Sequence, residues 1–287
     1  MEILDQITDL IRSKRTQVPT LPAIVQKVIN LACSDETTVP ELGSLISRDQ
    51  AIANKLLRLA NSAYFGFSSK VDSIHRAISL IGFNEVFGLV VGMGVFSAFK
   101  GKGTKEVLDM RELWIHAIGC ATAAREIAKK LLPEKSELIF LNGLLHDMGK
   151  IFFAVYFPKE YGAVLRTAQE VQIPLFKQEK KMMGLSHADV AGLLMTHWRF
   201  PDNLIMPCQF HHRSDNCPRD YHQAALIVEL ADCLCNEAEI GTSGNPVIVR
   251  KESVHRQLKF SSNSQKEVMQ VLGEQEAEIK DFLDCLY

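Results

Sequence analysis

Apolar residues recur every three or four positions along almost the whole chain. Ile3, Ile7, Leu10 and Ile11 begin the pattern, and this spacing places four apolar side chains on one face of a helix. The alternation of apolar and polar residues that is typical of strands is scarce. The pattern therefore predicts an all-α fold with about a dozen helices.

Residues that favour helix ends divide this pattern into segments. Asp49 is expected to cap a helix over Gln50–Asn61, and Asp72 is expected to cap a helix over Ser73–Ile81. Asn84 is the expected cap of the apolar helix that follows. Further helices are predicted over residues 113–131, 136–153, 161–171, 187–198, 201–212 and 222–236.

The polar, glycine-rich segment Lys100–Lys105 predicts a boundary between two lobes. It divides the chain into an N-terminal helical lobe, residues 1–103, and a C-terminal helical lobe, residues 104–287. The apolar run Val86–Phe99 contains glycines and falls short of the roughly 20 residues that span a bilayer. We therefore expect a buried helix there and no membrane partner.

Charge and cysteine content narrow the function classes. The 32 Lys and Arg residues against 34 Asp and Glu give a net charge of -2, so a global basic field for nucleic acid is excluded and no nucleic-acid partner is expected. The seven cysteines are odd in number and scattered, and the N-terminus is acidic where a signal peptide would be apolar. This composition predicts reduced thiols in a cytoplasmic protein.

Candidate chemistry is concentrated in the histidines, seven of which lie between His116 and His222. Glu112 and His116 are four residues apart, so a helix would place the carboxylate and the imidazole on one face, where they could chelate a divalent cation. Taken alone, such a pair is more often solvated or part of a helix cap.

His146 and Asp147 are adjacent within an apolar segment, where burial is costly unless something compensates their desolvation. A metal ion would do so, because histidine offers a neutral nitrogen and aspartate an anionic oxygen that can bridge two cations. Gly149 leaves space beside them. The alternative is a buried hydrogen bond between the two side chains.

The remaining candidates lie farther along the chain. His187 follows a plausible cap, Ser186, and could itself be a capping histidine. His211 and His212 diverge by about 100 degrees on a helix, so both reach one site if the end of their helix points at it. Asp232 lies in an apolar segment where an unpaired carboxylate is costly, and a cationic partner is therefore expected.

The order of these residues resembles the HD-domain superfamily of metal-dependent phosphohydrolases, an all-helical fold in which such side chains surround one to three cations. The series is Glu112, His116, His146, Asp147, His187, His211, His212 and Asp232. The full set is closest to the HD-GYP phosphodiesterases. Such a protein would continue after His212 with Glu, Asp-Gly and Gly-Tyr-Pro, whereas this chain continues with Arg213-Ser-Asp-Asn-Cys-Pro. That difference argues against hydrolysis of cyclic di-GMP.

The N-terminal half resembles the HDOD module, an HD-related output domain of bacterial signalling proteins. The resemblance covers about residues 15–215. It rests on Leu21-Pro22, Ile46-Ser-Arg-Asp49, Ser73–Gly82 and the distinctive block Asn61-Ser-Ala-Tyr-Phe65. HDOD proteins commonly lack metal ligands and have no established activity. This sequence has a candidate ligand at every expected position, so metal binding is expected here.

The resemblance implies a phosphohydrolase or phosphodiesterase with two divalent cations about 4 Å apart, bridged by Asp147, which would activate water for attack on a phosphorylated nucleotide or other phosphodiester. The other members of the series would be terminal ligands, and Glu112 could admit a third ion. Lys150 would offset charge on the phosphate, although it fits a solvated lysine at a helix end equally well. An imidazole-rich shell favours iron, manganese, nickel or zinc.

The alternative function is a non-catalytic signalling module that binds a protein partner. Its metal site would then be structural or vestigial. The candidate partner surface comprises Leu56, Leu57, Tyr64 and Phe65, although such residues more often belong to a core.

Overall fold

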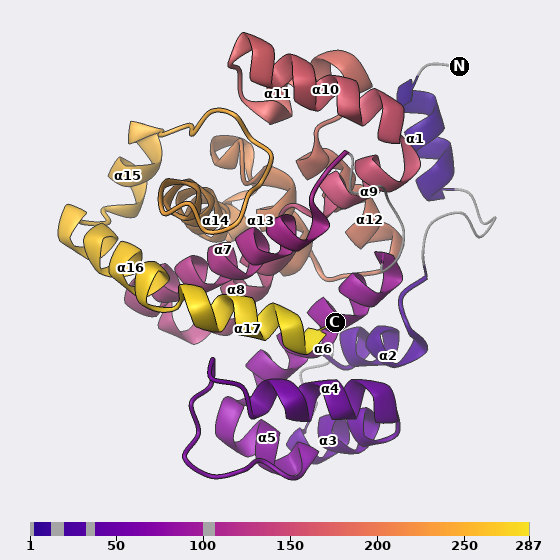
Figure 1. The fold of residues 1–287 in the computed structure, drawn as a ribbon, viewed down its shortest axis with the longest axis vertical. Helices are drawn as coiled ribbons and strands as arrows, with labels where there is room; N and C mark the ends of the chain where they lie inside the picture. Colours follow the sequence, from indigo (N-terminus) through magenta and orange to yellow (C-terminus); the bar gives the residue numbers. More distant parts are fainter. Residues whose placement is uncertain (1–2, 13–19, 33–37, 100–106, 287) are drawn as a thin grey trace. The chain divides into compact units, whose positions relative to one another are not determined.

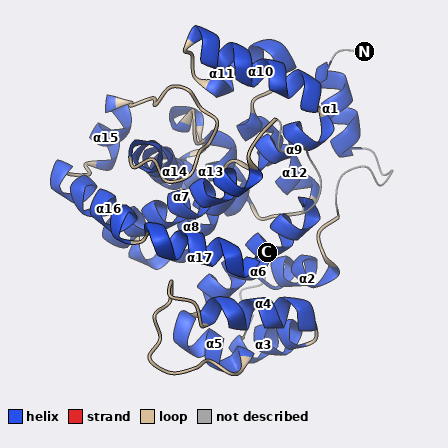
Figure 2. Cartoon of the chain, in the orientation of Figure 1, coloured by secondary structure: helices blue, strands red, loops and turns tan. Residues whose placement is uncertain are grey.

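Every regular element in the residues that the structure describes is a helix (Figures 1 and 2). This computed structural model describes residues 3–12, 20–32, 38–99 and 107–286. The all-α prediction is confirmed, but the described residues form 17 α-helices rather than about a dozen. The additional helices include short polar ones whose apolar face is too narrow to produce a clear periodic pattern.

Residues 20–100 and 274–287 form one of two compact units. Its helices are α2 (Ala23–Ala32), α3 (Val39–Ser47), α4 (Gln50–Ala60), α5 (Ile74–Ile81), α6 (Phe83–Phe99) and α17 (Glu276–Leu286). Helix α17 packs against α4, and the ring of Tyr64 lies 4.9 Å from that of Phe282. Leu56 is fully buried, whereas Leu57 and Phe65 are half-buried. The candidate partner surface therefore contributes to the packing of this unit.

Helix caps in this unit agree with the sequence at one position and differ at two. Asp49 caps α4 as predicted, because its carboxylate accepts a hydrogen bond from the Ile52 amide. The prediction for Asp72 is wrong, because the Ser73 hydroxyl caps α5. Helix α6 begins at Phe83, so Asn84 lies inside its first turn and is not the cap.

Residues 1–19 and 101–273 form the second unit. Its helices are α1 (Ile3–Arg12), α7 (Met110–Leu131), α8 (Ser136–Leu145), α9 (Met148–Tyr156), α10 (Pro158–Val171), α11 (Leu175–Met183), α12 (His187–His197), α13 (Asp202–Phe210), α14 (Arg219–Glu237), α15 (Glu252–Leu258) and α16 (Ser262–Glu274). Helix α7 packs against α8 and α14 along its length (Figure 1). Helix α1 packs against α12, which places the N-terminal segment in this unit.

The predicted lobes, 1–103 and 104–287, differ from these units at both ends of the chain. The first 19 residues belong with the later part of the sequence, and residues 274–287 belong with the earlier part. The predicted boundary segment, Lys100–Lys105, lies outside the described residues.

The predicted single helix over residues 136–153 is wrong, because it is two helices separated by His146 and Asp147. Apolar periodicity continues across this break, since both helices are buried on most sides. The stretch Pro133–Tyr156 is long and apolar enough to cross a membrane, but 89% of its most apolar window is buried inside the protein. His146 and Asp147, which lie at the break, are both buried.

Candidate metal centre

Seven of the eight predicted ligands come together inside the second unit. Three of them lie on helices: His116 on α7, His187 at the start of α12 and Asp232 on α14. His146 and Asp147 occupy the break between α8 and α9, and His211 and His212 directly follow α13. Side chains from five separate segments of the chain therefore meet at one site.

One group of ligand atoms comes from His116, His146 and Asp147, all within 4.8 Å of one another. Asp147 Oδ2 lies 3.3 Å from His146 Nε2 and 3.9 Å from His116 Nε2. Asp232 joins this group, because its Oδ1 lies 3.1 Å from His116 Nε2 and 3.8 Å from His146 Nε2. Two imidazoles and two carboxylates thus converge.

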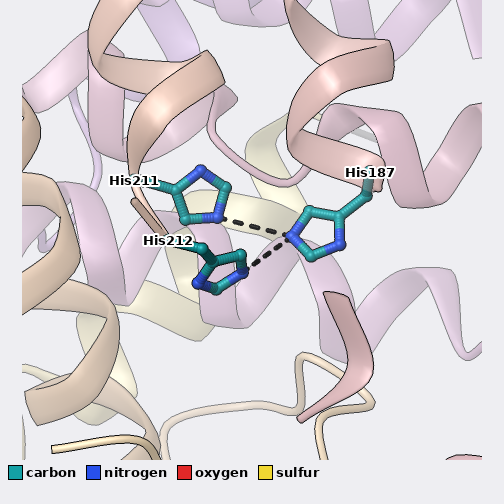
Figure 3. Close-up of side chains that lie close together, drawn as sticks. All are labelled: His187, His211 and His212. Atoms are coloured by element: carbon teal, nitrogen blue, oxygen red, sulfur yellow. Dashed lines mark hydrogen bonds between the residues drawn. The ribbon is translucent and has the colours of Figure 1, made fainter. Parts of the chain in front are cut away.

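A second group consists of His187, His211 and His212, whose ligand atoms also lie within 4.8 Å of one another (Figure 3). His187 Nε2 lies 3.4 Å from His211 Nε2 and 3.0 Å from His212 Nε2. The other oxygen of Asp147, Oδ1, lies 3.2 Å from His187 Nε2 and 3.9 Å from His211 Nε2. Asp147 therefore presents one carboxylate oxygen to each group.

Hydrogen bonds fix which ring nitrogen faces the cluster. His146 Nδ1 donates to the carbonyl of Gly143 at 2.6 Å, and His211 Nδ1 donates to that of Cys208 at 2.6 Å. His187 Nδ1 donates to Glu179 Oε2 at 2.6 Å. Because Nδ1 holds a proton in all three rings, Nε2 of each neutral ring presents its lone pair to the cluster.

The carboxylates are held in their charged form. Burial disfavours ionisation of Asp147, but the charges of His146 and Lys150 outweigh it and hold the pKa of Asp147 well below its usual range. Burial likewise opposes ionisation of Asp232, and hydrogen bonding and charge from His116 together with the charge of His146 lower its pKa. Both side chains are therefore anionic at neutral pH.

The histidines divide between the two protonation states. Burial opposes protonation of His187, but the Glu179 carboxylate outweighs it and raises the pKa of His187 to about 9. Burial and the charges of His146 and His187 lower the pKa of His211 to about 3. Burial and its neighbours His211 and His187 also lower the pKa of His212. Without a metal ion, the proton bound by His187 therefore balances part of the negative charge of the buried carboxylates.

Unpaired atoms test whether these residues fit a metal ion. Among the described residues, His146 Nε2 and Asp147 Oδ1 are buried in the cluster without a hydrogen-bond partner. Two nitrogens bound about 2.1 Å from one tetrahedral ion lie about 3.4 Å apart, close to the 3.4 and 3.0 Å that separate His187 Nε2 from the Nε2 atoms of His211 and His212. The buried donors and their spacing therefore fit divalent cations.

Lys150 lies inside the site, so its interpretation as a solvated lysine is wrong. It is 2% exposed, and its Nζ donates to Asp147 Oδ2 at 2.6 Å and to the carbonyl of Ser243 at 2.9 Å. Because α9 begins at Met148, Lys150 lies one turn after Asp147 and points toward it. The lysine neutralises and orients this carboxylate.

Glu112 belongs to neither group of ligand atoms. It is half-buried on the first turn of α7, where its backbone amide donates to the capping carboxylate of Asp109 and its carbonyl oxygen accepts a hydrogen bond from the Thr242 amide at 3.2 Å. A role for Glu112 at a third ion stays a prediction.

The sequence pattern did not indicate two residues that lie beside the site. Glu179 is fully buried against His187, although it lies on α11 among exposed lysines. Phe176 stacks on His212 with the ring centroids 4.6 Å apart. Helix α11 is short and polar, so neither periodicity nor motif spacing indicated that it packs on the site; a carboxylate eight residues before a candidate ligand is too weak a signal.

A small pocket of about 20 Å³, room for roughly one water molecule, reaches the cluster beside α14. Its lining includes Phe176, His212, Glu229, Asp232 and Lys251. Lys251 pairs with Glu229 and donates to the carbonyl of His212 at 2.6 Å. Among the candidate ligands, Asp232 and His212 line this pocket, one from each group.

Comparison with known proteins agrees with this architecture. An uncharacterized protein of Treponema pallidum (strain Nichols) is 26% identical over 241 residues, which are 81% of this chain and 45% of that relative. The chain therefore spans less than half of that relative. An HDOD domain protein of unknown function from Geobacter sulfurreducens has a TM-score of 0.79 at 24% identity, with 99% of each chain covered.

A protein provisionally described as a phosphohydrolase from Shewanella amazonensis SB2B has a TM-score of 0.75 at 20% identity, covering 99% of this chain and 98% of that one. At such identities these structures establish a shared fold. The sequence model of the HDOD domain matches residues 18–214, which include six of the seven clustered ligands but not Asp232. The chain belongs to the HDOD domain family.

Proposed function

We propose that this HDOD protein holds two divalent cations and hydrolyses a phosphate ester, either a phosphodiester or a phosphorylated nucleotide. The position of Asp147 supports this function above all other observations. Its two carboxylate oxygens face separate groups of imidazoles, at 3.3 Å from His146 Nε2 and 3.2 Å from His187 Nε2. A carboxylate shared in this way is what a pair of neighbouring cations requires.

The candidate ligands divide into two sets with Asp147 in common. One cation would be held by His116, His146 and Asp232, and the other by His187, His211 and His212. When bound, such ions polarise a phosphoryl oxygen and lower the pKa of water to near neutrality. An imidazole-rich donor set favours iron, manganese, nickel or zinc over magnesium or calcium.

The protein contributes charge, orientation and exclusion of water. His116, His146, His187 and His211 are fully buried, so their lone pairs do not compete with bulk solvent. Lys150 holds the carboxylate of Asp147 in place and adds a positive charge close to where a phosphate would bind.

Elemental analysis of protein purified without chelator tests the metal centre. We expect bound transition metal in the wild type and its loss in Asp147→Ala, because that change removes the shared ligand. Asp189→Asn is the matched control: Asp189 is also buried, but it bonds Ser186 and Arg213 rather than a candidate ligand. Metal-free wild-type protein that gains no ion on reconstitution would contradict the centre.

Hydrolysis of bis(p-nitrophenyl) phosphate by the reconstituted protein then tests the activity. We expect metal-dependent turnover that disappears in His146→Ala and Asp147→Ala. If the metal-loaded wild type hydrolyses neither this ester nor any of a panel of nucleotides, the hydrolase function is contradicted and the non-catalytic alternative is supported.

That alternative is a non-catalytic output module, and one observation favours it. The ammonium of Lys150 lies 2.6 Å from Asp147 Oδ2 and compensates the charge of the buried carboxylate without a metal ion. An output module predicts that His146→Ala and Asp147→Ala fold and still bind a signalling partner. Pull-down of interacting proteins with these variants and the wild type distinguishes the two functions, because a module retains the same partners in all three.

A further inference from the structure

A fully buried carboxylate lies behind one of the candidate ligands. Glu179 is 0% exposed, whereas Lys180 and Lys181, the residues that follow it on α11, are exposed. A carboxylate in such surroundings is costly unless every oxygen finds a hydrogen-bond donor. Packing of α11 alone therefore does not account for the burial of Glu179.

The carboxylate of Glu179 receives three hydrogen bonds. Oε2 accepts from the backbone amide of His187 at 2.8 Å and from His187 Nδ1 at 2.6 Å. Oε1 accepts from the hydroxyl of Tyr161 at 3.0 Å. Since Tyr161 occupies one oxygen, the other stays directed at His187.

These contacts determine how the ring of His187 faces the cluster. A proton on Nδ1, held by Glu179, leaves Nε2 directed at Asp147 Oδ1, 3.2 Å away, and at His212 Nε2, 3.0 Å away. The backbone is fixed as well, because α9 approaches so closely at Gly149 that a Cβ there would overlap the carbonyl oxygen of His187. Ring and backbone are thus both held in one orientation.

We propose that Glu179, held by Tyr161, is a positioning residue that directs and strengthens His187 as a metal ligand through Nε2. This inference rests on the proposed metal centre. A carboxylate that accepts the second N–H of a ligating imidazole orients the ring and increases its basicity, and loss of such a partner typically weakens metal affinity about 10–100-fold. Glu179 acts through His187 and does not itself contact a cation or substrate.

Zinc affinity of the whole chain, measured by competition with a chromophoric chelator, tests this role. We expect Glu179→Gln to weaken zinc binding about 10–100-fold relative to the wild type. Tyr161→Phe should weaken it about 2–10-fold, because one hydrogen bond to the carboxylate is lost. Asp189→Asn is the matched control: it alters the cap of the same helix, α12, without touching a ligand ring, so its zinc affinity should equal that of the wild type.

Nitrogen-15 NMR of the histidine rings in the zinc-loaded protein provides a readout that a purely structural role would not move. In the wild type and Asp189→Asn, we expect His187 to carry its proton on Nδ1 and zinc on Nε2. In Glu179→Gln that pattern should weaken or become mixed, while far-UV circular dichroism shows an unchanged helical content.

The outcomes distinguish failure of the metal centre from failure of the positioning role of Glu179. Wild-type protein that binds no zinc overturns the metal centre itself. Tight zinc binding by the wild type with equal affinity and an unchanged His187 signal in Glu179→Gln overturns the role of Glu179 alone. If Glu179→Gln does not fold, Tyr161→Phe decides: a several-fold weaker affinity supports the role, and an affinity equal to the wild type overturns it.

Discussion

The ammonium group of Lys150 is buried between the carboxylate of Asp147 and the carbonyl of Ser243. Two opposite charges buried together compensate each other, and removal of one partner leaves the other charge uncompensated. Lys150 lies three residues after Asp147, one turn of helix away, whereas Ser243 belongs to a distant part of the sequence. At the scale of single residues, charge compensation therefore decides how this site is built.

Lys150→Met should destabilise the metal-free protein by about 1.5–3 kcal/mol, because the buried Oδ2 atom of Asp147 would lose the charged donor that bonds it. Saturating zinc should recover part of that loss, since a bound cation replaces the missing charge. Urea unfolding with chelator and with zinc measures both effects. Lys130→Met serves as the control: Lys130 forms an exposed pair with Glu267 at 2.6 Å, so its loss should cost at most about 1 kcal/mol. Equal effects of the two substitutions would contradict the role of Lys150.

Two helices meet at Gly149 more closely than side chains ordinarily permit. Helices α9 and α12 pack together, and the missing side chain of Gly149 makes room for the carbonyl of His187. The sequence indicated that Gly149 leaves space beside His146 and Asp147. The structure shows that the backbone of another candidate ligand fills this space.

Gly149→Ala should destabilise the protein by about 1–3 kcal/mol, because the added methyl group forces α9 and α12 apart. It should also weaken zinc binding, since His187 moves with its backbone. Gly273→Ala is the matched change in α16, where a Cβ would meet no atom within 4 Å. There we expect a gain of up to about 1 kcal/mol from the higher helix propensity of alanine. Denaturant unfolding of both variants checks the pair, and a neutral Gly149→Ala would contradict the close approach.

Across the whole molecule, the cluster couples folding to pH when no metal is bound. The pKa of His187 is raised to about 9, so its stabilisation is complete below the unfolded value of about 6.5 and is lost as pH rises through 9. The pKa of His211 is lowered to about 3, so its contribution is present above about 6.5 and is lost as pH falls through 3.

The metal-free protein should therefore be most stable near pH 6.5, with each group contributing a slope of up to about 1.4 kcal/mol per pH unit on its own side. Urea unfolding in chelator between about pH 5 and pH 9 measures this profile. His187→Asn should flatten the alkaline side relative to the wild type, and His211→Asn should flatten the acid side. Identical pH profiles in all three proteins would show that these rings do not control the dependence.

The sequence by itself determined the features that arise from local chemistry. Apolar periodicity established the all-α class, and Asp49 and Ser186 were found as caps because a cap bonds within its own first turn. The candidate ligands stood out because charged and imidazole side chains are costly in apolar segments. Seven of them do meet, although Glu112 lies outside both groups.

Tertiary structure decided what depends on contacts between distant segments. The bond of Lys150 to the carbonyl of Ser243, the carboxylate of Glu179 behind His187 and the packing of α17 on α4 join residues whose local sequence patterns do not indicate one another. Burial and hydrogen bonding assign each ring nitrogen and each carboxylate oxygen its direction, and these forces act only once the chain has folded. Spacing along the sequence can indicate a candidate ligand, but the surrounding helices determine which of its atoms faces the site.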